Sequence, residues 1–134
     1  MGYRSRVIGS LVIKPPLQLD VINGSRFLPR HPDEGNLEVS YLINNDRLPP
    51  CAVAIEPAEE EEHKAYELHE QLQSIADEVI AAGSTLYGHI VRIGESQGDV
   101  ERYGLGTGHA AHQIVSEKAI LSWPDGELLG DCDA

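Results

Sequence analysis

The sequence predicts an α+β fold, and three observations support this class. The chain has 134 residues, enough to bury one core without help from disulfides or metal ions. One long segment repeats its apolar residues with the 3.6-residue period of a helix, whereas shorter segments alternate or are rich in β-branched residues, as strands are. These segments follow one another in an order typical of an antiparallel sheet with helices on one face.

The long helix is predicted over residues 60–82. Its apolar residues fall on one stripe, at Leu68, Leu72, Ile75, Ala76, Val79 and Ile80. The polar residues between them are expected to face water, namely Glu67, Glu70, Gln71, Ser74 and Glu78. Pro57 suits the first turn, where its missing N–H costs no hydrogen bond, and Gly83 suits a left-handed cap after the last turn.

The part of the chain before this helix predicts three strands and a shorter helix. Residues 6–14 are rich in Val and Ile, so we expect a strand that ends at the two prolines that follow. Residues 17–28 are predicted to form a short helix that begins at those prolines. Residues 37–43 alternate and residues 51–55 form a short apolar run, so both are expected to be strands.

The part after the helix predicts three more strands, over residues 85–95, 100–106 and 112–123. The first six elements then match a ferredoxin-like βαββαβ arrangement, an antiparallel sheet with both helices on one face. The last two strands are expected to extend this sheet as a C-terminal pair or to form an appended hairpin. We expect a single α+β domain over residues 1–124 and an acidic, flexible tail over residues 125–134.

The charge of the chain is strongly negative and unevenly distributed. The net charge is −12, and residues 56–78 carry nine acidic residues against one Lys. Residues 1–55 carry five acidic residues and six Lys or Arg, so this part is almost neutral. Binding to nucleic acid needs Lys and Arg to displace counterions, and anionic membranes attract the same cations. The charge therefore excludes nucleic acid and anionic membranes as direct partners.

The cysteines and the N-terminal residues indicate a cytoplasmic protein. Cys51 and Cys132 have neither the number nor the spacing of a disulfide framework or a zinc site. The N-terminal segment lacks the long apolar core of a secretory signal, and no apolar run reaches the length of a membrane span. We therefore expect a reduced compartment and no membrane partner.

The glycine-rich segment 103–112 is the part of the sequence that most resembles a ligand loop. Its glycines alternate, whereas a dinucleotide loop needs G-x-G-x-x-G between a strand and a helix. His109 and His112 supply two ligands, but zinc needs at least a third, and no spacing points to one. A flexible hairpin loop is the better interpretation. The sequence predicts no catalytic residue, no cofactor and no metal.

Residues 2–17 read G-Y-x-S-R-x-x-G-x-L-x-I-x-P-P-L and resemble the start of a known protein family. Further matches follow in order along the chain: Tyr66-Glu67-Leu68 with Leu72-Gln73, then Gly88, Gly94-Glu95, Gly98-Asp99 and Arg102, then Trp123-Pro124-Asp125. On these residues the chain is similar to a family of small uncharacterised proteins from actinobacteria and their phages. This resemblance implies no activity, so no residue gains a role from it.

Two functions from different classes stay open. The first, which we favour, is a non-enzymatic interaction or inhibitor module, of a kind that a phage could encode, that presents an acidic face to a basic protein. The predicted partner face consists of Glu59, Glu60, Glu61, Glu62, Glu67 and Glu70. The alternative is a binder or enzyme for a nucleotide or another anion, with a ligand loop of Arg102, His109 and His112. A third interpretation is that the acidic residues only keep the domain soluble.

Overall fold

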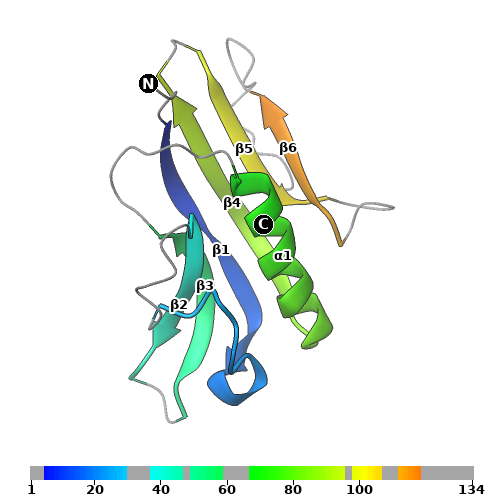
Figure 1. The fold of residues 1–134 in the computed structure, drawn as a ribbon. Coiled ribbons are helices and arrows are strands. Elements are labelled where there is room, and N and C mark those ends of the chain that lie inside the picture. Colours follow the sequence, from blue (N-terminus) through cyan, green and yellow to red (C-terminus); the bar gives the residue numbers. More distant parts are fainter. Residues whose placement is uncertain are drawn as a thin grey trace.

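The fold is a six-stranded antiparallel sheet with an α-helix on one face (Figure 1). The computed structural model describes residues 5–29, 37–46, 49–58, 67–95, 98–106 and 112–118. The strands are β1 (Ser5–Gln18), β2 (Val39–Asn44), β3 (Cys51–Pro57), β4 (Thr85–Gly94), β5 (Val100–Leu105) and β6 (Ile114–Lys118). The helix α1 covers Leu68–Ala81, and a single 3₁₀ turn, η1, covers Leu19–Val21.

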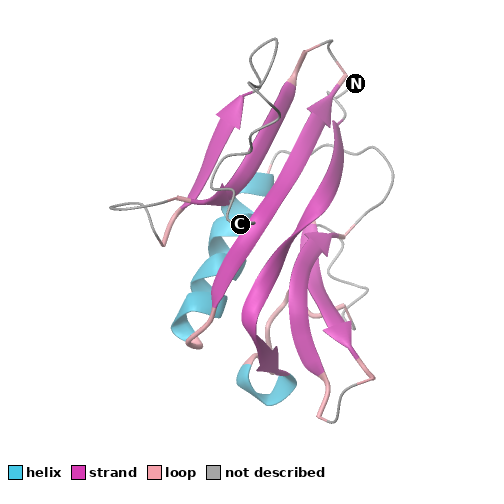
Figure 2. Cartoon of the chain, turned by 180° about the vertical axis from the view of Figure 1, so that it is seen from behind, coloured by secondary structure: helices cyan, strands magenta, loops and turns pink. Residues whose placement is uncertain are grey.

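Strand β1 organises the sheet, whose order is β2-β3-β1-β4-β5-β6. Along its length β1 pairs with β4, from Ser5 opposite Gly94 to Lys14 opposite Thr85, and it pairs with β3 on its other side. The helix lies on one face, which we call the inner face. Figure 2 shows the opposite face, which we call the outer face, in front of the helix.

The ferredoxin-like prediction is wrong, because the predicted helix over residues 17–28 does not form. Leu17 pairs with Ala52 and Gln18 with Cys51, so β1 continues beyond the two prolines that were expected to end it. The prolines fall where the β1–β3 register shifts, so their missing N–H groups lie at an irregular part of the ladder. In the described ranges, α1 is the only α-helix, and the sheet dominates the fold.

The long helix is confirmed in its C-terminal part. Its buried side contains five of the six residues of the predicted stripe, Leu68, Leu72, Ile75, Ala76 and Val79, and the sixth, Ile80, is half-buried. Gly83 follows with a φ of 94°, so it is the expected left-handed residue after the helix. Pro57 is the last residue of β3 instead of a first-turn residue, and residues 59–66, with the predicted helix start, lie outside the described residues.

Two polar residues of α1 differ from the prediction that they face water. Gln71 is 1% exposed, and its Oε1 accepts a hydrogen bond of 2.8 Å from the backbone N–H of Glu38. Glu78 is half-buried and accepts hydrogen bonds from two other side chains. Both residues lie at the edge of the apolar stripe, seven positions apart, so they meet the strands and loops beside the helix.

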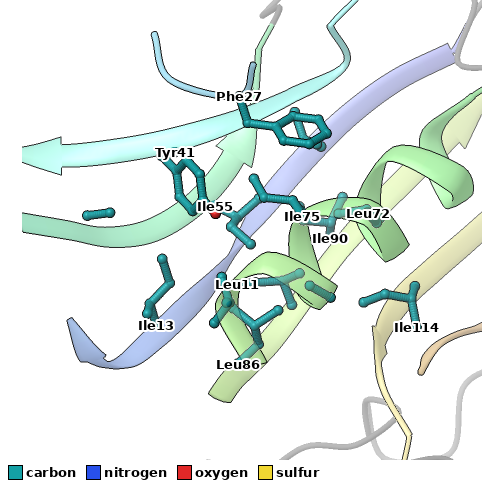
Figure 3. Packing of buried hydrophobic residues seen from close by; sticks show 14 of the residues in the cluster. Leu11, Ile13, Phe27, Tyr41, Ile55, Leu72, Ile75, Leu86, Ile90 and Ile114 are labelled. Atoms are coloured by element: carbon teal, nitrogen blue, oxygen red, sulfur yellow. The ribbon is translucent and has the colours of Figure 1, made fainter. Parts of the chain in front are cut away.

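The core fills the space between α1 and the inner face of the sheet. Figure 3 shows Leu11, Ile55 and Ile90, from three neighbouring strands, with Leu72 and Ile75 of the helix. All five side chains are fully buried. Phe27, from the segment that was predicted to be helical, is buried as well. An apolar residue of that segment therefore contributes to the core, but from a loop.

The remaining strand predictions are confirmed with small changes in their bounds. Strand β6 pairs with β5, and β5 pairs with β4, so the last two strands extend the sheet as predicted. The prediction for residues 112–123 is tested only to Lys118. Residues 119–134, and with them the predicted domain end and acidic tail, lie outside the described residues.

Gly9 of β1 generates a prediction about stability, because two constraints exclude a side chain there. Its φ is +95°, and an added Cβ would lie 2.5 Å from the backbone oxygen of His89 in β4. Gly24 is a matched control, since its φ is +96° with nothing within 4 Å of an added Cβ. We expect Gly24→Ala to lower the free energy of unfolding by about 1–2 kcal/mol, and Gly9→Ala to lower it further. Urea unfolding of both variants measures this, and equal losses would contradict the steric argument.

Candidate functional site

The predicted acidic partner face is only partly described. Glu59, Glu60, Glu61 and Glu62 lie outside the described residues. Glu67 precedes the first residue of α1, Glu70 lies in its first turn, and both are exposed. The backbone N–H of Glu67 donates a hydrogen bond of 2.9 Å to the carboxylate of Glu38. The structure therefore places the two described acids at the start of the helix, and the face as a whole stays a prediction.

The predicted ligand loop is not assembled by its described residues. Arg102 is 4% exposed, lies on the outer face of β5 and forms an ion pair with Glu117 of β6. His112 is exposed just before β6, and its carbonyl accepts a hydrogen bond of 3.3 Å from Gln73 of α1. Glu117, the partner of Arg102, lies five positions after His112, roughly 16 Å away at the rise of a strand. His109 lies outside the described residues.

The two described glycines of the same segment, Gly104 and Gly106, also have a structural explanation. Gly104 is a residue of β5 opposite Val115, and the N–H of Gly106 donates to the carbonyl of Gln113. An added Cβ on Gly104 would lie 3.2 Å from Cδ2 of His89, so this glycine makes room for the buried imidazole ring. The pairing confirms a hairpin between β5 and β6.

The outer face carries most of the exposed apolar side chains in the described ranges. Side chains alternate along a strand, so the residues between the buried ones point away from α1. Six large apolar residues of the described ranges are exposed, and five of them lie on this face: Ile8 (41%), Val12 (40%), Leu42 (40%), Tyr87 (38%) and Ile93 (37%). The sixth, Val21, lies in η1.

The strand register arranges three of these side chains, Leu42, Val12 and Tyr87, in a row across the sheet. Leu42 of β2 pairs with Ala54 of β3, Ala54 with Val12 of β1, and Val12 with Tyr87 of β4. The row therefore crosses four neighbouring strands. The amino group of Lys14 lies 5.3 Å from the centre of the Tyr87 ring, within the range of a cation–π contact. We call Ile8, Val12, Leu42, Tyr87 and Ile93 the outer apolar patch.

Arg92 and Arg102 lie on opposite faces of the sheet, whereas an anion site would need their guanidinium groups to converge. Arg92 of β4 lies on the inner side, where its guanidinium binds Asp99 at 2.9 and 3.2 Å and Glu101 at 3.3 Å. It also donates to the hydroxyl of Ser5 at 3.1 Å. Arg102 points to the outer face. Each of the two guanidiniums is held by carboxylates of neighbouring strands or turns, so both ion pairs stabilise the sheet.

A hollow beside the C-terminal end of α1 is the site that the sequence analysis did not identify. It has a volume of about 460 Å³ and is lined by residues of η1, the following turn and the last turn of the helix: Val21, Ile22, Asn23, Gly24, Ser25, Glu78, Ala81 and Ala82. Oε1 of Glu78 accepts hydrogen bonds from Ser25 Oγ at 2.7 Å and from Tyr41 OH at 2.9 Å. The sequence feature that could have pointed to this site is the position of Glu78 at the edge of the apolar stripe.

The described residues hold no group of three or more His, Cys, Asp or Glu that could bind a metal ion. No helix in the described part of the chain is both long and apolar enough to cross a membrane. No family model, curated protein or solved structure matches the chain. The resemblance to small proteins of actinobacteria and their phages therefore stays a prediction.

The two buried tyrosines generate a prediction about pH. Burial, and then the hydrogen bond and charge of Glu101, raise the pKa of Tyr103 from 10.0 to about 12. Burial and Glu78 raise the pKa of Tyr41 as well. Below pH 10 both phenols are neutral in the folded and unfolded chain, so they cause no pH dependence. Between pH 10 and 12 the unfolded chain loses a proton that the folded chain retains, so the free energy of unfolding falls as the pH rises.

Urea unfolding across this alkaline range measures the effect. The variant Tyr103→Phe cannot ionise at this position, so its stability should fall less steeply with pH than that of the wild type. An identical slope for the two proteins would show that Tyr103 is not responsible.

Proposed function

We propose that this protein is a non-enzymatic interaction module that binds another protein through its outer apolar patch. The observation that carries the proposal is the gathering of five of the six exposed large apolar side chains of the described ranges on one sheet face. Scattered apolar residues are normal on a protein surface, whereas a contiguous apolar patch marks an interaction site. Three of them, Leu42, Val12 and Tyr87, lie with Ala54 in a row across four strands, which supports an extended contact with a folded partner.

The net charge of the chain indicates which class of protein it binds. A second copy of this chain would bring together two molecules of net charge −12, and this repulsion opposes self-association. A partner with a positive net charge and an apolar contact surface is attracted instead, and the attraction raises its association rate. Exposed acids such as Glu67 and Glu70 contribute to this field. The partner is therefore a basic protein, and direct binding to nucleic acid is not part of the proposal.

The small-molecule alternative at residues 102–112 has less support. An anion site needs an available cation, and the guanidinium of Arg102 is buried and paired with Glu117. His112 lies toward the helix, away from Arg102.

A cytoplasmic setting belongs to the proposal, since Cys51 is a buried free thiol, as is usual in a reducing compartment.

Substitutions on the outer face test the proposal. The double variant Val12→Ser with Leu42→Ser removes two exposed apolar side chains from the row. The control Asp77→Ser removes an exposed side chain of α1, which lies on the other face of the sheet. In pull-downs from a lysate of the organism that carries the gene, the double variant should lose a partner that wild type and Asp77→Ser both retain. The loss should exceed about tenfold in affinity, as expected for central apolar contacts of an interface.

Two further readouts separate the parts of the proposal. Circular dichroism and urea unfolding check that the double variant is folded. The association rate of the captured partner should fall with added salt, because net charge steers the encounter. Equal binding by wild type and the double variant would overturn the proposal for this face. An association rate that is independent of salt would contradict the basic character of the partner.

A further inference from the structure

The hollow beside the last turn of α1 has the size of a small-molecule site. Its volume of about 460 Å³ falls within the range of roughly 300–1,000 Å³ that ligand pockets occupy. Figure 1 shows the backbone segments that line it, the last turn of α1 and the short blue coil that contains η1. None of its lining residues belongs to the outer apolar patch, so the two sites are separate. Its walls are apolar at Val21, Ile22, Ala81 and Ala82 and polar at Ser25 and Glu78.

Glu78 is held in the wall of this hollow with one carboxylate oxygen already occupied. Ser25 Oγ and Tyr41 OH both donate to Oε1. No described residue donates a hydrogen bond to Oε2. The donors come from the loop after η1 and from β2, so they fix the side chain from two directions. The carboxylate is therefore pre-positioned, and its second oxygen is available for a ligand.

Glu78 lies in the last turn of α1, near the negative end of the helix dipole. The C-terminal end of a helix carries partial negative charge, where a cation is stabilising and a carboxylate is not. The last turn of α1 contains no basic residue. Arg26 is close in sequence to the hollow, but its guanidinium lies over the Phe27 ring at 4.8 Å, and Arg26 is not a lining residue. The lining residues of the hollow in the described part of the chain include no Lys or Arg. No lining side chain therefore balances the negative potential of the carboxylate and the helix end.

We propose that this hollow binds an organic ammonium group on a short apolar stem. The ammonium ion would donate to Oε2 of Glu78 in a charge-assisted hydrogen bond. The stem would lie against the apolar wall formed by Val21 and Ala81. Two sources offer this chemistry, a free aliphatic amine and the lysine side chain of a bound protein. The shared requirement is a positive charge at the end of a few methylene groups.

Nuclear magnetic resonance titration with butylammonium tests this site directly. Butylammonium should shift the backbone amide signals of Gly24, Ser25 and Ala82 with saturation. Neutral 1-butanol has a similar shape without the charge and should bind at least about tenfold more weakly, since hydrogen bonds to charged groups are the stronger class. Equal shifts from both compounds would overturn the proposal, because the hollow would then recognise only the apolar stem.

The variant Glu78→Gln removes the charge and keeps an oxygen that can accept from Ser25 and Tyr41. It should bind butylammonium at least about tenfold more weakly than wild type. Asp77→Asn is the matched control, since it removes the same charge from an exposed neighbour that contacts Gln73 and does not line the hollow. It should bind as wild type does. Equal losses in both variants would overturn a specific site and show an effect of net charge alone.

The source of the ammonium group is distinguished by a second ligand, Nα-acetyl-lysine methylamide. Tighter binding of this compound than of butylammonium assigns the hollow to a lysine side chain of a protein, and the reverse order assigns it to a free amine. Absence of saturable shifts with both compounds overturns the proposal. Because wild-type protein is used for these titrations, the result does not depend on the folding of any variant.

Discussion

The pairing of β1 with both β3 and β4 is the constraint on which the rest of the structure depends. This strand of 14 residues lies at the centre of the sheet, and its alternation assigns residues to the two faces. Leu11 and Ile13 point inward to the helix, whereas Ile8 and Val12 point outward. A central strand with apolar residues on both sides is expected where both faces are covered. In the described ranges a single helix covers one face, so the outer apolar patch follows from the composition of β1 and its neighbours.

Polar contacts then fix the helix at its edges. Gln71 receives the N–H of Glu38, and Glu78 receives the hydroxyls of Ser25 and Tyr41. An apolar stripe alone allows a helix to rotate or slide over a sheet, because hydrophobic contact is not directional. Hydrogen bonds from specific positions remove this freedom. The same contact that holds α1 to the loop after η1 also orients the carboxylate beside the hollow, so anchoring and ligand binding share one residue.

The sequence predicted the strands and part of the helix, but it did not predict the contacts that their side chains make with neighbouring elements. Alternation and helical period are local properties, and they located six strands and the C-terminal part of α1. The failure at residues 17–28 arose because prolines were interpreted as the end of a strand, whereas a register shift accommodates them in β1. The partner of Arg102 could not be read from its spacing, since Glu117 comes opposite only through the β5–β6 register. Glu78 was assigned to water because periodicity describes one helix and not the loop that packs against it.

The two-sided apolar composition of β1 also bears on how the chain selects its own register during folding. A slip by one residue exchanges the two faces of a strand. For Ile8 and Val12 such an exchange would cost little free energy, because either side chain is apolar and could fill the core. The outward positions of Arg6, Ser10 and Lys14 are different, because a slip would bury two cations and a hydroxyl against the helix. These three polar residues therefore discriminate against the misaligned strand, and fidelity of folding rests on them more than on the apolar residues that form the core.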